Sequence, residues 1–257
     1  MNAFTRELHL FFNALTFFSR IPAPAWVKFS SAQLNHASRY FPLVGLLIGL
    51  IAAALYAAFS LLFPSTIAVL LSTGCTVLLT GGFHEDGLAD VCDGFGGGWS
   101  TEQTLHIMKD SRLGSYGALG LVLVLGLKLA TLVSLASLGD ILLALLVGHT
   151  LSRFVAASLI HTDSYVQLDE LSKVRPLAQR MSQSELLIAA APALACLFLL
   201  PGHSALAIIV TLLLVRLYLC RLFRRRLGGY TGDCLGATQQ LSEVAIYLAL
   251  CLPPSLL

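Results

Sequence analysis

The stretch LVGLLIGLIAAALYAAFSLLF (residues 43–63) contains 21 residues and no charged side chain. A helix needs about 20 consecutive apolar residues to cross the hydrocarbon core of a bilayer, so this stretch predicts a transmembrane helix. Pro64 and Ser65 predict a turn after it. Further apolar stretches predict spans over residues 66–79, 113–138, 141–160, 186–200, 205–220 and 244–252. We therefore expect an all-α polytopic membrane bundle of about seven transmembrane helices, within a range of six to eight.

The composition of the whole chain agrees with this class. Hydrophobic residues make up 56% and charged residues 12% of the 257 residues, whereas a soluble domain carries about 25% charged residues. We treat residues 1–257 as one integral membrane domain. The net charge of +2 gives no reason to expect a nucleic-acid partner. The six cysteines are scattered without a C-x-x-C pair, which favours neither a disulfide framework nor a zinc site.

The N-terminal segment has a different pattern. Phe4, Leu8, Phe11, Leu15 and Phe18 fall on one face of a helix. This spacing predicts a helix that lies in the membrane interface or packs against the bundle.

Basic residues predict the orientation. The short turns near residues 64, 139 and 202 contain no Lys or Arg. If the spans alternate as predicted, 13 of the 16 basic residues lie on the opposite side: Arg6, Arg20, Lys28, Arg39, Lys109, Arg112, Lys173, Arg175, Arg180, Arg221, Arg224, Arg225 and Arg226. The positive-inside rule assigns that side to the cytoplasm, which predicts a multi-pass membrane protein with its long loops in the cytoplasm.

The segment GGFHEDGLADVCDG (residues 81–94) interrupts the apolar pattern. Asp86, Asp90 and Asp93 stand at i, i+4 and i+7, which places three carboxylates on one face of a helix. Hard carboxylate oxygens suit Mg²⁺ or Mn²⁺, so this face can hold two ions, or one ion beside a general base. We expect residues 83–112 to form a cytoplasmic active-site loop. The alternative is a solvated acidic loop, and His84 is either a structural residue or an acid–base group.

Two further segments are candidates for the same site. Lys109, Asp110 and Arg112 close the acidic loop, where they either bind phosphate oxygens or simply flank a span. Residues 221–240 form a second candidate cytoplasmic loop that contains Gly232 and Asp233. Asp233 either completes a metal site, acts as a base or caps a helix.

Two cations lie inside predicted spans. Lys128 and Arg153 find no carboxylate within their own spans, and buried cations need partners. We expect them to face a cavity open to the cytoplasm, where substrate phosphate or the acidic loop neutralises at least one of them. Arg216 lies near a span end, where its side chain can reach the interface.

Residues 81–94 resemble the most characteristic motif of the cobalamin synthases, the adenosylcobinamide-GDP ribazoletransferases. Glu85 departs from that motif, which favours an apolar residue there. Four other segments resemble the same family, in the same order along the chain: SRIP (residues 19–22), FPLVG (41–45), MKDSRLG (108–114) and LGGYTGDCLG (227–236).

The resemblance implies a Mg²⁺-dependent transfer between adenosylcobinamide-GDP and α-ribazole or its phosphate. GMP would leave, and adenosylcobalamin or its phosphate would form. Asp86, Asp90 and Asp93 would hold the metal, and one of them or Asp233 would take the proton, with His84 beside them. The resemblance and the charges together imply substrate-binding roles for a further set: Arg20, Lys109, Asp110, Arg112, Lys128, Arg153 and Gly232. Other cobalamin-assembly enzymes are candidate partners, and the oligomeric state is left open.

Two other functions fit parts of the pattern. A CDP-alcohol phosphotransferase of phospholipid synthesis also uses a carboxylate cluster and a nucleotide leaving group. However, the Arg expected in the motif of those enzymes is Asp90 here, and the later Gly-x-x-x-Asp-x-x-x-Asp part of their motif is absent. A secondary transporter would place its polar site near mid-membrane, and only Lys128 and Arg153 favour it.

Overall fold

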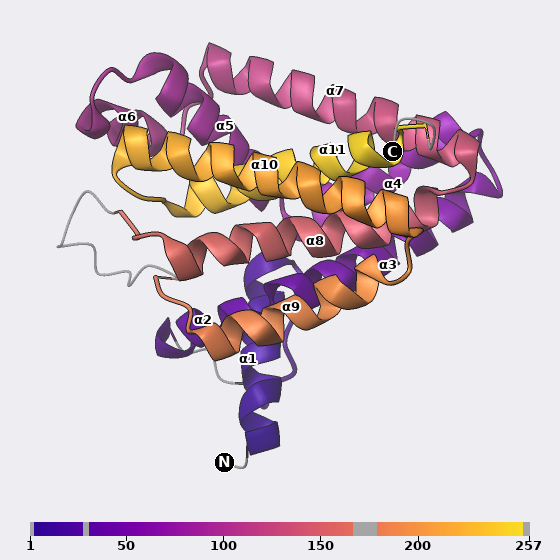
Figure 1. The fold of residues 1–257 in the computed structure, drawn as a ribbon, viewed down its shortest axis with the longest axis horizontal. Helices are drawn as coiled ribbons and strands as arrows, with labels where there is room; N and C mark the ends of the chain where they lie inside the picture. The colour runs from indigo at the N-terminus through magenta and orange to yellow at the C-terminus, as the bar shows by residue number, and fades with distance from the viewer. Residues whose placement is uncertain (1–2, 28–30, 167–178, 254–257) are drawn as a thin grey trace.

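The computed structural model describes residues 3–27, 31–166 and 179–253. Three basic residues used above, Lys28, Lys173 and Arg175, lie outside these ranges. The described helices are α1 (Ala3–Phe18), α2 (Ser31–Ala37), the 3₁₀ helix η1 (Ser38–Tyr40), α3 (Phe41–Ser60), α4 (Ser65–Thr80), α5 (Phe83–Gly97), α6 (Thr101–Met108), α7 (Ser115–Leu138), α8 (Ile141–Thr162), α9 (Gln183–Leu197), α10 (Gly202–Leu227) and α11 (Gly232–Leu250). They form a bundle, shown in Figure 1, and confirm the predicted all-α class.

The long apolar stretches became helices close to their predicted bounds. By length and composition, four described helices qualify as membrane spans, at Gln33–Ser60, Ser115–Leu138, Ile141–Thr162 and Gly202–Leu227. The bent pair α4 and α5 adds a fifth if it counts as one span. Fewer helices qualify than the seven expected, because α9 has only 15 residues and α11 carries several polar side chains. Both still pack lengthwise in the bundle (Figure 1).

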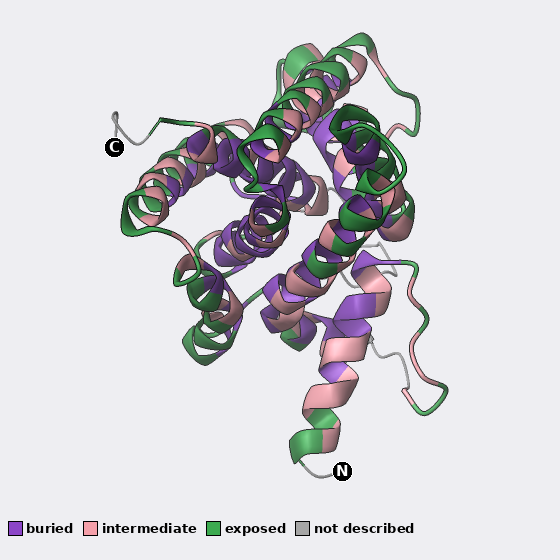
Figure 2. Cartoon of the chain, turned by 90° about the vertical axis from the view of Figure 1, so that its right-hand side faces the viewer, coloured by how far each residue is buried: buried purple, intermediate pink, exposed green. Residues whose placement is uncertain are grey.

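Helix α8 occupies the centre of the bundle. It packs against α3, α9 and α11, and its side chains are mostly buried. Outward faces remain apolar, as at Leu119 and Leu123 of α7 and Leu213 of α10. Figure 2 shows this distribution, with buried residues inside the bundle and exposed ones around its outer surface. Exposed leucines on long helices are suited to contact with lipid chains.

The bundle has two chemically different ends. The turns before α8 and α10 and the end of α11 meet at one end, where Asp140, His203 and Cys251 line a shared cavity. At the other end, Arg226 donates a hydrogen bond to the carbonyl of Gly98. The basic last turn of α10, Arg224, Arg225 and Arg226, therefore lies at this second end.

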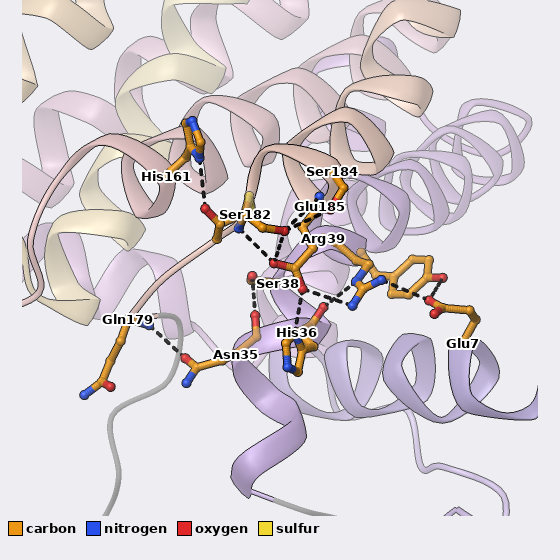
Figure 3. A network of polar contacts seen from close by, with 12 residues as sticks. Glu7, Asn35, His36, Ser38, Arg39, His161, Gln179, Ser182, Ser184 and Glu185 are labelled. Atoms are coloured by element: carbon orange, nitrogen blue, oxygen red, sulfur yellow. Dashed lines mark hydrogen bonds and ion pairs between the residues drawn. The ribbon is translucent and has the colours of Figure 1, made fainter. Parts of the chain in front are cut away.

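A buried polar network attaches the N-terminal helix to the bundle (Figure 3). The Arg39 guanidinium bonds Glu185 of α9 at 3.0 Å, and Tyr40 donates to Glu7 of α1 at 2.7 Å. His36 lies 2.6 Å from the same Glu185 carboxylate. The network thus holds α1 at Glu7, and the helix is buried on one face from Leu10 to Phe18, while Phe4 at its start is 71% exposed.

Two consecutive glycines orient the acidic segment. Gly81 and Gly82 both adopt the left-handed conformation, with φ of 73° and 72°, which glycine adopts without steric cost. The chain bends there by 86° between α4 and α5. Helix α5 therefore does not continue the direction of α4 but lies across the end of the bundle.

Candidate active site

The acidic segment that we expected as a loop is helix α5. Its carboxylates differ in environment, since Asp86 is exposed, Asp90 is half-buried and Asp93 is buried. The helix lies directly against the start of α11. A side chain at Gly87 would come within 3.0 Å of the Asp233 backbone, so only glycine allows this approach. The fold thus brings Asp233 to the acidic helix, although 140 or more residues separate them in the sequence.

Asp93 has a structural role that the sequence did not indicate. Its two carboxylate oxygens accept hydrogen bonds of 2.8 Å from the backbone N–H groups of Gly114 and Gly117. Those groups belong to the first turn of α7, whose N–H groups have no partner within the helix. Asp93 therefore caps α7 from a distant helix. This use of both oxygens sets it apart from Asp86 and Asp90 as a metal ligand.

The carboxyl groups of Asp90 and Asp233 have raised pKa values. Burial and then the nearby Asp86 raise the pKa of Asp233 to about 6, although a hydrogen bond from Thr231 lowers it. Asp90 lies on α5, outside the four long spans. Burial, Asp233, Asp86 and Asp93, in that order, raise its pKa to about 7. Asp86, Asp90 and Asp233 thus repel one another across the contact of the two helices, and a cation between them would relieve this repulsion.

The donor set fits a hard divalent cation. In the described part of the chain, no group of three or more His, Cys, Asp or Glu side chains is arranged as a ready metal site. Mg²⁺ seldom needs one, since it is usually bound through one or two carboxylates, waters and substrate phosphates. Asp86 and Asp90, with their oxygen donors and mutual repulsion, fit that mode of binding.

The turn between α6 and α7 lies at the same end of the bundle, because Gly114 bonds Asp93. Within it, the Arg112 guanidinium pairs with Asp110 at 2.6 Å. This pairing holds the pKa of Asp110 down at about 2. Although it pairs with Asp110, the Arg112 side chain is 87% exposed and therefore accessible from the solvent. Lys109 is exposed as well.

Arg20 reaches the corner between α4 and α5. Its backbone N–H donates to the Leu79 carbonyl at 2.8 Å. A Cβ atom at Gly81 would lie 3.2 Å from Arg20 Nε. The predicted substrate-binding role of Arg20 stays a prediction, but the structure places its exposed side chain beside the entrance to α5.

Near the carboxylates is a largely apolar pocket, and five of its lining residues carry aromatic rings. His84 is buried and stacks on Phe18, with ring centroids 5.7 Å apart. The pocket brings His84 together with two other predicted residues, Arg153 and Gly232. Its phenylalanines were missed from the sequence: Phe17, Phe18, Phe41 and Phe83. They come from three helices, so no local spacing indicated them.

The charge of Lys128 is neutralised within the bundle. Its Nζ lies 2.8 Å from Oε1 of Glu243, and both side chains are buried. Lys128 therefore needs neither substrate phosphate nor the acidic segment to neutralise it, and the expectation that at least one of the two cations is neutralised in that way now applies to Arg153, where it stays a prediction. Glu243 also accepts hydrogen bonds from Tyr247 at 2.8 Å and from Gln239 at 2.5 Å. A buried carboxylate with these partners explains how the cation is accommodated.

Arg153 is less completely satisfied. Its Nη1 donates to the His149 carbonyl at 3.0 Å. Its Nε is buried and has no hydrogen-bond partner in the part of the chain that the structure describes.

Glu243 was missed because the last span was placed at residues 244–252, whereas α11 begins at Gly232. Gln239, Glu243 and Tyr247 stand at i, i+4 and i+8, so they share one face of a helix. This polar face could have indicated Glu243 from the sequence.

The model of the cobalamin-5-phosphate synthase family matches residues 10–251 of this chain. The chain belongs to the cobalamin-5-phosphate synthase family. An adenosylcobinamide-GDP ribazoletransferase from Shewanella frigidimarina is 54% identical over 95% of both chains. One from Shewanella oneidensis is 51% identical over 95% of this chain and 94% of its own. No solved structure matches significantly.

Membership of the cobalamin-5-phosphate synthase family confirms the resemblance found in the motifs. The structure also shows why those separate segments belong together. Arg20 contacts Gly81, Gly114 bonds Asp93, and Asp233 packs on Gly87. Phe41 of the FPLVG segment lines the aromatic pocket. All five motif segments therefore meet around α5.

Proposed function

We propose that this protein is a membrane-bound adenosylcobinamide-GDP ribazoletransferase. It joins α-ribazole or α-ribazole phosphate to adenosylcobinamide-GDP, releases GMP and forms adenosylcobalamin or its phosphate. The family and the names of the relatives support this activity. The structural observation that carries it is the meeting of Asp86, Asp90 and Asp233 at the contact of α5 with α11, where Gly87 packs on the Asp233 backbone, Asp86 and Asp233 raise the pKa of Asp90, and Asp86 raises that of Asp233.

The reaction is a displacement at phosphorus. A ribose hydroxyl oxygen forms a bond to the corrinoid-proximal phosphorus, the bond from that phosphorus to GMP breaks, and the hydroxyl proton passes to a base. Catalysis of such transfers depends mainly on positioning and charge neutralisation. Asp233 suits the role of base, because a half-buried carboxyl with a pKa of about 6 can accept a proton near neutral pH.

Asp86 and Asp90 would hold Mg²⁺, for which Mn²⁺ can substitute. The ion would neutralise charge on the diphosphate and on the leaving GMP. Lys109 and Arg112, both exposed at the same end, would bind phosphate oxygens. Asp110 holds Arg112 at 2.6 Å until phosphate competes for it.

The site would face the cytoplasm of a bacterium, with the bundle in the inner membrane. Support comes from the basic last turn of α10, whose Arg226 bonds the Gly98 carbonyl at the end of α5, whereas the short turns near residues 64, 139 and 202 contain no Lys or Arg. A cytoplasmic site is also consistent with a nucleotide-activated substrate.

The test measures GMP release by the purified protein in detergent micelles, with and without α-ribazole and with and without Mg²⁺. We expect release only when both are present. Asp90→Asn should lower kcat by roughly 100-fold or more, as loss of a group that neutralises transition-state charge does. Glu102→Gln, an exposed acidic position on α6, is the matched control and should stay within about two-fold of the wild type.

GMP release without α-ribazole, or full activity of Asp90→Asn, would overturn the proposal. The same assay separates the alternatives. A CDP-alcohol phosphotransferase would release CMP from a CDP-alcohol, and a transporter would release no nucleotide. The transporter loses one of its two arguments, because Lys128 is neutralised by Glu243.

A further inference from the structure

We propose that the aromatic pocket between α1, α3, α5, α8 and α11 binds the planar base of α-ribazole, a dimethylated benzimidazole. This inference rests on the proposed function and assigns one of its two substrates to a defined place. The pocket adjoins the carboxylates, since Gly232 precedes Asp233 and His84 lies two residues before Asp86.

The walls suit a flat apolar ring. Phe18 stacks on His84, while Phe41 meets Phe18 edge to face with ring centroids 4.0 Å apart. Phe83 also contacts Phe17 and Phe18 edge to face, at 5.1 and 5.8 Å. Aromatic rings arranged in this way favour further stacked or edge-to-face contacts with a planar ligand.

The polar groups discriminate between the ligands of the reaction. In α-ribazole one base nitrogen carries the ribose, so the other nitrogen is the single hydrogen-bond acceptor of the base. The Arg153 Nε–H is a buried donor without a partner among the described residues, and it belongs to a side chain that lines this pocket. Satisfying such a donor is worth about 1–3 kcal/mol. The pocket therefore matches a base with one acceptor and an otherwise apolar outline.

Guanine and the corrin ring fit less well. Guanine presents several donors and acceptors along its edges, and aromatic walls would leave most of them unpaired at high cost. The corrin macrocycle is larger than the base and carries amide side chains, which walls of phenylalanine would leave unpaired. The benzimidazole base is thus the part of the two substrates that this pocket accommodates.

The position of the pocket also places the attacking group. Nothing lies within 4 Å of the Cβ position of Gly232, so the backbone is open to a ligand beside Asp233. A base held between Phe18 and Arg153 would extend its ribose toward this opening. The ribose hydroxyl would then lie near Asp233, the residue proposed to take its proton.

The test narrows the pocket with Ala156→Leu. Ala156 lines the pocket from α8 and is buried. We expect the KM for α-ribazole to rise by about 10-fold or more, the usual size of a steric penalty in an apolar pocket. The KM for adenosylcobinamide-GDP should stay within about two-fold. The KM for the riboside of unmethylated benzimidazole should rise less than the KM for α-ribazole, because the unmethylated base is smaller.

Ala130→Leu on the exposed face of α7 is the matched control, and both KM values should equal those of the wild type. An unchanged KM for α-ribazole in Ala156→Leu, or a selective rise for adenosylcobinamide-GDP, would overturn the proposal. If Ala156→Leu does not give folded protein, Phe83→Ala carries the test. Phe83 is 39% exposed. Its loss should also weaken the binding of α-ribazole without weakening that of adenosylcobinamide-GDP.

Calorimetric binding of α-ribazole to the protein in micelles separates the two proposals. If the wild type bound α-ribazole and Ala156→Leu did not, the pocket would stand even if no GMP were released. If both bound it equally, the pocket assignment would fail whatever the enzyme's activity.

Discussion

Asp86 and Asp93 lie two turns apart on α5, yet they belong to different parts of the structure. Asp86 is exposed at the site, whereas Asp93 is buried and bonds two N–H groups of α7. The i, i+4, i+7 spacing treated all three aspartates as equivalent. Their roles separate only because the start of α7 packs on the C-terminal half of α5.

Asp93→Asn should therefore mainly lower stability. The amide presents only one acceptor where two N–H groups need one each, and lost helix capping costs about 0.5–2 kcal/mol. We expect a lower melting temperature in detergent, measured by intrinsic fluorescence, with Asp86→Asn melting like the wild type. If Asp93→Asn melted normally and required more Mg²⁺ for activity, Asp93 would be a metal ligand instead.

The buried pair of Lys128 and Glu243 is also a residue-scale feature. Glu243→Gln would leave the Lys128 cation buried without its counter-charge, which typically costs about 3–5 kcal/mol. The double variant Lys128→Met, Glu243→Gln removes both charges and should recover part of this loss. Thermal unfolding of Glu243→Gln, Lys128→Met and the double variant, compared with the wild type, measures the coupling. Equal melting of Glu243→Gln and the wild type would show that the pair contributes nothing.

At the scale of helices, the contact of α3 with α8 depends on glycines. Gly45 and Gly49 are four residues apart on α3 and face α8. A Cβ atom at Gly45 would collide with the His149 carbonyl, and one at Gly49 would lie 2.9 Å from the Leu145 carbonyl. Small residues at this spacing allow membrane helices to approach closely.

Gly45→Ala should separate α3 from α8 and destabilise the protein by about 1–3 kcal/mol. Gly126→Ala is the control, because Gly126 is exposed on α7 with nothing within 4 Å of its Cβ position. That change should be neutral or slightly stabilising, since alanine favours a helix. Melting temperatures in detergent test both, and equal melting of the two variants would contradict close α3–α8 packing.

At the scale of the whole molecule, the two ends of the bundle should face opposite sides of the membrane. In a variant without native cysteines, Asp140→Cys should react with a membrane-impermeant maleimide on intact spheroplasts. Gln103→Cys on α6 should react only after permeabilisation. Both positions are exposed in the structure. The reverse pattern would place the site outside the cytoplasm.

Local information in the sequence was sufficient for the helices themselves. Apolar runs bounded by Pro64, Gly139 and Pro201 predicted α3, α7, α8 and α10 to within a few residues at most ends, because length and turn residues act locally. Motifs likewise indicated Asp86, Asp90 and Asp233 as site residues. The family followed from the same motifs.

Tertiary structure decided which of these groups act together. Gly81 and Gly82 bend the chain by 86° at α5, and packing on α11 brings Asp233 to Asp86 and Asp90. Packing also lets Asp93 cap the start of α7, pairs Glu243 with Lys128, and brings four phenylalanines together around one pocket. The sequence could not show these pairings, because each joins helices that are distant in the chain and depends on which faces of those helices meet.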